Sequence, residues 1–111
     1  MTAPALGSLE LTVLLAVSRL GEDAYGLAIR RDLAERTGRD HSVGAIYTTL
    51  GRLEAKGFVA SRLTEPLPVR GGRARKEFRL TGAGERALRA AARVTARVWA
   101  DVGTTINPKP A

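Results

Sequence analysis

The chain of 111 residues carries 18 Lys and Arg against 11 Asp and Glu, a formal net charge of +7, together with one His and no Cys. This composition excludes disulfides, Cys nucleophiles, Cys-ligated zinc and His-pair metal centres, and we expect no cofactor. The length fits one small domain, and the longest apolar run, residues 13–17, is far shorter than the roughly 20 residues that cross a membrane, so we expect a cytoplasmic protein.

The first predicted elements are a short N-terminal arm, residues 1–7, and a helix over residues 9–20. Ser8 is the expected N-cap of this helix, and Gly21 is its expected end. The apolar residues cover nearly the whole circumference, and a helix that is apolar all round must be buried on more than one side. We therefore expect the domain's own core to cover one side and a second subunit to cover the other, with Leu9 and Val13 at the dimer interface.

Two further helices are predicted over residues 25–36 and 43–56. Gly38 ends the earlier one, Ser42 is the expected N-cap of the later one, and Gly57 lies at its C-terminal stop. Gly26 stands near the start of a helix, where glycine costs roughly 1 kcal/mol relative to alanine. Close packing against a neighbouring helix is the expected reason for it.

A β-hairpin follows the three helices. Residues 58–63 and 75–80 are rich in strand formers, and the segment between them contains two prolines as well as Gly71 and Gly72. We therefore predict two strands joined by a long basic tip.

A long helix completes the chain. Thr81 is its expected N-cap, the helix covers residues 82–102, and residues 103–111 form a flexible tail. The predicted fold is mainly α (α+β): a winged helix-turn-helix of three helices and a two-stranded β-wing over residues 8–80, plus a long C-terminal dimerisation helix over residues 81–102.

The third predicted helix has a small and nearly neutral outer face. A helical projection places its apolar residues on one side, which leaves two glycines and short polar side chains on the other. Small side chains let the backbone approach a DNA groove closely, threonine hydroxyls can bind phosphate, and the planar fork of Arg52 suits guanine or phosphate. The candidate DNA-binding residues of this recognition helix are Ser42, Gly44, Ala45, Tyr47, Thr48, Thr49 and Arg52.

Three residues near this helix have competing interpretations. Tyr47 lies at the border of the apolar side, so its ring is either partly buried with the hydroxyl reaching a phosphate, or packed into the core. His41 is interpreted as a loop residue before the N-cap, with a backbone phosphate contact as the alternative. Lys56 is interpreted as a charge that stabilises the helix C-terminus rather than as a DNA contact.

The positive charge is concentrated in one part of the chain. Nine basic and two acidic residues lie between Arg70 and Arg97, so this segment holds the whole excess of +7. The arginines of the last helix recur at helical spacing and are equally well explained as its solvated face. The wing has no such explanation, and we expect backbone contacts with DNA from Arg70, Arg73, Arg75 and Lys76.

A stripe along the last helix indicates a dimer contact. Its members are separated alternately by three and four residues, which is the spacing of a short coiled coil, and the alternative is that they pack on their own domain. Trp99 lies where the three-helix core should no longer reach, so burial against a second subunit is its expected role. The predicted interface residues of this helix are Leu88, Ala91, Thr95, Val98, Trp99 and Val102.

Several segments resemble the PadR-like family of transcriptional regulators, in order and with the family's spacing, over about residues 6–90. They include Asp23-Ala-Tyr-Gly-Leu27, Ser42-Val-Gly-Ala-Ile-Tyr47-Thr-Thr-Leu50, Gly71-Gly-Arg73 to Lys76 and Phe78-Arg-Leu-Thr81. The chain is most similar to short-form members, which lack a larger helical C-terminal domain. One departure is Glu77, where many members carry an aromatic residue.

The resemblance implies a bacterial winged-helix homodimer that binds a palindromic operator, often as a repressor. It implies backbone contacts from Tyr47 and the wing, a dimer formed by the first and last helices, and a possible small aromatic effector near Trp99.

The leading hypothesis is therefore a sequence-specific regulator that binds double-stranded DNA as a homodimer. A winged-helix protein-interaction module and a nonspecific DNA-binding protein are the alternatives. An enzyme is not expected, because a hydrolytic triad would have to be built around His41 and the sequence offers neither a Gly-rich phosphate loop nor a spaced carboxylate pair.

Overall fold

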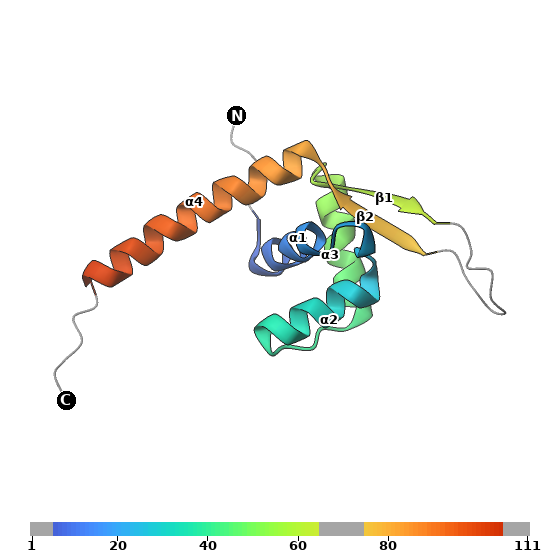
Figure 1. Ribbon diagram of the computed structural model, residues 1–111, viewed down its shortest axis with the longest axis horizontal. Coiled ribbons are helices and arrows are strands. Elements are labelled where there is room, and N and C mark those ends of the chain that lie inside the picture. Colours follow the sequence, from blue (N-terminus) through green and yellow to red (C-terminus); the bar gives the residue numbers. More distant parts are fainter. Residues whose placement is uncertain (1–5, 65–74, 106–111) are drawn as a thin grey trace.

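The computed structural model describes residues 6–64 and 75–105, with side chains described as far as Ala100. Figure 1 shows a compact group of helices, with the hairpin projecting to one side and the last helix extending away on the other. This architecture confirms the predicted mainly α winged helix-turn-helix with a long final helix. The elements in chain order are α1 (Ser8–Leu20), the 3₁₀ turn η1 (Gly21–Asp23), α2 (Gly26–Thr37), α3 (Val43–Ala55), β1 (Val59–Leu63), β2 (Lys76–Leu80) and α4 (Gly82–Thr105).

The core lies between the helices and the inner face of the hairpin. Helix α1 is at its centre, since it packs against α2, α3, β2 and α4 of its own chain. Val13 is therefore fully buried inside the domain, which corrects its assignment to a dimer interface. The largest fully buried side chains are Leu14, Ile29, Leu33, Ile46, Leu50 and Leu53.

Local signals at the helix ends were mostly interpreted correctly. The Ser42 hydroxyl accepts a hydrogen bond from the Ala45 N–H at 3.1 Å, as an N-cap does, and Gly38 ends α2 in the left-handed conformation. The prediction for α1 was wrong by one residue. Gly7 is its N-cap, because the Glu10 carboxylate accepts the Gly7 N–H at 3.0 Å and Ser8 is already helical.

The hairpin is fastened to the helical body as well as to itself. Strands β1 and β2 pair antiparallel, with Ser61 opposite Phe78. Tyr25, just before α2, forms an isolated bridge with Glu77, and the Phe78 N–H donates to the Ala24 carbonyl at 2.8 Å. The segment between η1 and α2 therefore acts as a short second partner for β2, on the side away from β1.

Helix α4 begins immediately after the hairpin. The Thr81 hydroxyl donates to the Gly57 carbonyl at 2.6 Å and accepts the Gly84 N–H at 3.0 Å, which confirms Thr81 as the cap. Gly84 is buried, and a Cβ placed there would lie 2.0 Å from the Phe58 carbonyl oxygen. This junction fixes the direction in which α4 leaves the domain.

The far part of α4 extends into solvent. Every described side chain from residue 92 to residue 100 is exposed. The helix continues to Thr105, so the first three residues of the predicted flexible tail are helical. None of the helices that the structure describes is long and apolar enough to cross a membrane.

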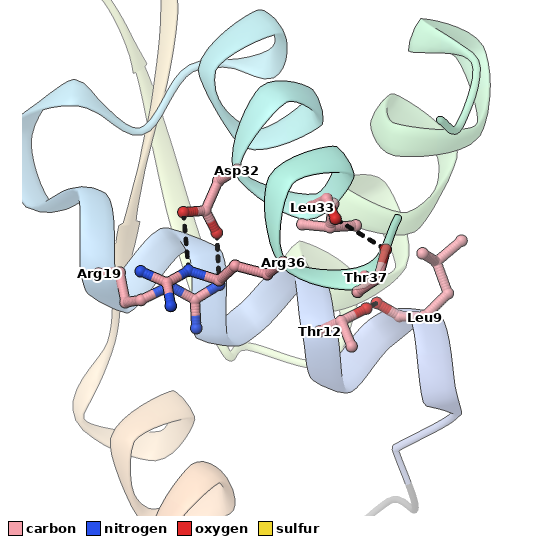
Figure 2. A network of polar contacts seen from close by, with 7 residues as sticks. All are labelled: Leu9, Thr12, Arg19, Asp32, Leu33, Arg36 and Thr37. Atoms are coloured by element: carbon pink, nitrogen blue, oxygen red, sulfur yellow. Dashed lines mark hydrogen bonds and ion pairs between the residues drawn. The ribbon is translucent and has the colours of Figure 1, made fainter. Parts of the chain in front are cut away.

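Two ion-pair groups fasten α1 to its neighbours. Asp32 on α2 accepts hydrogen bonds from Arg19 of α1 and from Arg36 one turn along α2, as Figure 2 shows. These hydrogen bonds, Arg19 foremost, hold the pKa of Asp32 below its ordinary value despite partial burial. At the other end of α1, Glu10 pairs with Lys56 at 2.7 Å, and this bond lowers the Glu10 pKa.

Candidate nucleic-acid interface

Helix α3 presents an exposed face of small and polar residues. Its apolar side is buried in the core, while Ser42, Gly44, Thr48 and Arg52 are exposed and Ala45 is partly exposed. Gly44 and Gly51 have no neighbouring backbone or core atom close to where a Cβ would stand. The space over this face is therefore open, as a helix that approaches a DNA groove requires.

Thr49 does not belong to this face. Only 4% of the residue is exposed, and its hydroxyl donates to the Ala45 carbonyl of the preceding turn at 2.8 Å. That bond satisfies the hydroxyl inside the helix, so a threonine can lie in the core without an unpaired polar group. Its assignment to the DNA contacts is corrected.

Tyr47 lies where α3 crosses the start of α2. Its ring is 6.4 Å from the Phe78 ring between centroids, yet 42% of the residue is exposed. A Cβ on Gly26 would stand 2.6 Å from the Tyr47 hydroxyl, so the missing side chain of Gly26 makes room for the ring. This is the close packing expected at Gly26. The Tyr47 hydroxyl makes no hydrogen bond within the described part of the chain, which leaves it available to a ligand.

The base of the wing carries two cations beside aromatic rings. The Arg75 guanidinium lies 4.7 Å from the centroid of the Tyr25 ring, and the Lys76 ammonium lies 5.7 Å from that of Phe78. Thr64 holds the backbone of Arg75 through hydrogen bonds to its N–H and its carbonyl, each of 3.1 Å. The other predicted wing contacts, Arg70 and Arg73, lie outside the described residues.

A hollow of about 250 Å³ joins these features. It opens between the start of α2, the middle of α3 and the base of the wing. Tyr25 and Arg31 were not expected here, since Arg31 follows the solvated pattern of α2 and no local signal sets it apart from its neighbours. The described residues around this basic hollow are Tyr25, Leu27, Arg31, Tyr47, Arg75 and Lys76.

Other charged residues near the interface form ion pairs that stabilise the fold. Lys56 pairs with Glu10 across to α1, so its role in stabilising the domain extends beyond its own helix terminus. Arg30 forms a two-point ion pair with Asp40 at 2.9 and 3.0 Å, which lowers the Asp40 pKa. His41 is partly exposed in the loop before α3, as expected.

The structure divides the predicted dimer residues into two groups. Leu9 and Leu88 are partly buried against the core of their own chain, and Ala91 is also partly buried. Thr95 is exposed, Val98 and Trp99 are 54% and 68% exposed, and the Val102 side chain lies outside the described residues. The alternative that the stripe packs on its own domain therefore applies to its beginning and not to Val98 or Trp99.

Comparison with known proteins gives a consistent result. The sequence profile of the transcriptional regulator PadR-like family matches residues 13–90. No curated protein sequence matches the chain. Among solved structures, a PadR family transcriptional regulator from Eggerthella lenta DSM 2243 is 30% identical, with a TM-score of 0.70 over 91% of this chain and 89% of that one.

Two more distant structures share the fold. A PadR family transcription regulator from Clostridium difficile R20291 has a TM-score of 0.77 at 22% identity, and the match covers 91% of this chain and all of that one. A PadR-like transcriptional regulator from Bacillus cereus strain ATCC 14579 has a TM-score of 0.74 at 23% identity, over 91% and 93% of the two chains.

Proposed function

Because the chain belongs to the PadR-like family of transcriptional regulators, we propose that it is a sequence-specific DNA-binding regulator that acts as a homodimer on a palindromic operator. The observation that carries this proposal is the exposed, small-residue face of α3, which stands next to the basic hollow. Repression is the expected outcome, since a dimer bound across a promoter blocks access to it.

The two parts of the interface have different tasks. Helix α3 enters the major groove, where Thr48 and Arg52 reach base edges and the Ser42 end of the helix faces a phosphate. Arg75 and Lys76 contact the sugar-phosphate backbone, which supplies affinity but carries no sequence information. Affinity and specificity therefore reside in different residues.

Dimerisation is proposed to occur through α1 and α4. Val94, Val98 and Trp99 expose more than half of their surface at the end of a helix that has left its own domain, and Leu15 on α1 is also exposed. Burying such side chains against a second subunit would stabilise the dimer by about 25 cal/mol for each Å² of apolar surface that is removed from water. The two-fold axis would place the two α3 helices about 34 Å apart, one turn of DNA.

A planar aromatic effector that stacks on Trp99 is part of this proposal. The indole is 68% exposed in the single chain, and the part of it that the second subunit leaves uncovered at the edge of the dimer interface offers a flat apolar surface. Binding would quench the fluorescence of this only tryptophan, and aromatic compounds that quench it should also alter DNA affinity.

The test compares a selected operator with random duplexes over a salt series. Selection from genomic fragments supplies the operator, and specific binding should exceed nonspecific binding by at least about 10³-fold. Arg52→Ala should relax base preference at one position of each half-site, whereas Arg75→Ala should weaken all duplexes alike. Equal affinity for every duplex would instead identify a nonspecific DNA-binding protein.

The protein-interaction alternative has a separate test. A winged-helix module that binds proteins should fail to shift any 30-base-pair duplex at low salt, where electrostatic attraction to DNA is strongest.

A further inference from the structure

The basic hollow between α2, α3 and the wing has the composition of an anion site. Three cations and two tyrosines surround it, and the described residues that line it include no carboxylate. The first turn of α2, which borders it, also contains no acidic residue. Like charges gathered without a counter-ion repel each other, so this arrangement favours an anionic ligand.

Arg31 is the cation whose role the fold does not explain. Its neighbours on α2 have partners: Arg30 pairs with Asp40, and Asp32 holds Arg36. Within the described residues Arg31 forms no ion pair or hydrogen bond, although it lines the hollow beside Tyr47 and Lys76. A guanidinium in this position can bind phosphate oxygens in a bidentate manner.

The hydroxyl of Tyr47 has a defined position in this hollow. Gly26 admits the ring, and the Phe78 ring lies behind it, so the hydroxyl stands over the start of α2. A single tetrahedral phosphate has enough oxygens to accept the Tyr47 hydroxyl, the Arg31 guanidinium and the Lys76 ammonium together.

We propose that Arg31 is a DNA-backbone contact and that Arg31, Tyr47 and Lys76 bind one and the same phosphate in each half-site. This inference rests on the proposed function and adds α2 to the DNA interface. Because residues from three elements share one phosphate, that contact fixes the rotation of α3 in the groove. The other contacts between the wing and the DNA backbone do not depend on this phosphate.

The test pairs protein variants with single neutral phosphates. Each phosphate of the operator is replaced in turn by methylphosphonate, which removes one charge, and affinities are measured for the wild type and for Arg31→Ala, Tyr47→Phe and Lys76→Ala. At one position per half-site the modification should weaken the wild type but cost each variant much less, and this position should be the same for all three. Effects that add independently at every position would overturn the proposal.

Matched variants separate the site from general charge. Arg31→Ala should weaken operator binding, and Arg31→Lys, which keeps the charge but cannot make the bidentate contact, should weaken it less. Arg93→Ala removes an equal charge from the exposed face of α4 and should leave the methylphosphonate pattern unchanged. Circular dichroism melting shows whether each variant is folded.

The outcomes distinguish this inference from its premise. If the wild type prefers the operator and Arg31→Ala behaves like Arg93→Ala, the shared phosphate is wrong and the proposed function stands. If the wild type shows no operator preference, the proposed function itself is wrong, and the inference falls with it.

Discussion

Gly26 and Tyr47 form a contact in which the absence of a side chain positions a ring. The three atoms nearest to a Cβ at residue 26 all belong to the outer part of the Tyr47 ring, at 2.6 to 2.9 Å, and a partly exposed ring can rotate away. We expect Gly26→Ala to change the free energy of unfolding by less than about 1 kcal/mol, because alanine's helix propensity offsets the lost packing. DNA affinity should nevertheless fall, as measured by fluorescence anisotropy.

A double variant identifies the cause of that loss. In a Tyr47→Ala background the ring is gone, so adding Gly26→Ala should weaken DNA binding no further. Additive losses would show that Gly26 acts in another way, for instance through the backbone of α2.

Sequence reasoning at single residues succeeded where the signal is local. Ser42 and Thr81 could be recognised as caps because each hydroxyl accepts the amide three residues further on, a contact that lies within one short stretch of sequence. The prediction of Ser8 as the N-cap of α1 was wrong because the Glu10 carboxylate accepts the Gly7 N–H, which makes Gly7 the N-cap. The prediction of Thr49 as a DNA contact was wrong because its hydroxyl bonds a carbonyl of its own helix. This bond allows Thr49 to be buried, although the apolar pattern placed it on the solvent side of α3. Arg31 has no local signal, since only the tertiary fold brings it beside Tyr47 and the wing.

At the scale of elements, the junction between the hairpin and α4 depends on one glycine. A Cβ on Gly84 would lie 2.0 Å from a backbone carbonyl oxygen, and no side-chain rotation can relieve that contact. Gly84→Ala should therefore destabilise the domain by about 3 kcal/mol, the upper part of the range for overpacking, as measured by urea denaturation. At Gly82 the nearest atom is the end of Arg86 at 3.5 Å, so Gly82→Ala should be tolerated and serves as the control. Equal stability of the two variants would contradict the packing described for α4.

The attachment of α1 to α2 should depend on pH through Asp32. Hydrogen bonds from Arg19 and then Arg36 lower its pKa in the folded state, so the unfolded chain takes up the proton first on acidification. The stabilisation is complete above about pH 4, the ordinary pKa of Asp, and is lost as the pH falls through the lower folded value. Asp32→Asn should be less stable at pH 7 and should lose less stability between pH 4 and pH 2 than the wild type, as measured by urea denaturation at each pH (about pH 2, 3, 4 and 7).

Glu10 and Asp40 also have lowered pKa values, so the variant keeps part of the acid sensitivity. An Asp32→Asn profile parallel to that of the wild type would show that the pKa of this carboxylate does not differ between the folded and unfolded states.

For the whole molecule, the sequence of one chain indicates which residues form its own core but not which surface a second subunit covers. The alternating stripe on α4 resembled a dimer seam throughout, yet Leu88 packs against its own domain while Val98 and Trp99 do not. Periodicity gives the face of a helix that is apolar, and the length of the helix beyond the body decides which part of that face remains uncovered.

A charge placed on the exposed part of the stripe should separate the subunits. Val98→Asp would bury a carboxylate in the proposed dimer, so the variant should sediment as a monomer and bind the full operator at least about tenfold more weakly. Ala100→Asp adds the same charge to an exposed position on the opposite side of α4 and should remain dimeric. Identical sedimentation of both variants and the wild type would place the dimer contact elsewhere.

The join at Thr81 leaves no slack between the domain and α4, because one hydroxyl is bonded to the hairpin corner and to the first turn of the helix together. In the proposed dimer, such a rigid connection would fix the distance and the relative orientation of the two α3 helices. Inserting one base pair between half-sites moves one of them by about 3.4 Å and turns it by roughly 34°. A rigid dimer cannot adjust to both the shift and the rotation. The operators of this protein should therefore keep a single spacing, so that the distance between two sequences in the genome is as much a part of the recognised signal as the sequences themselves.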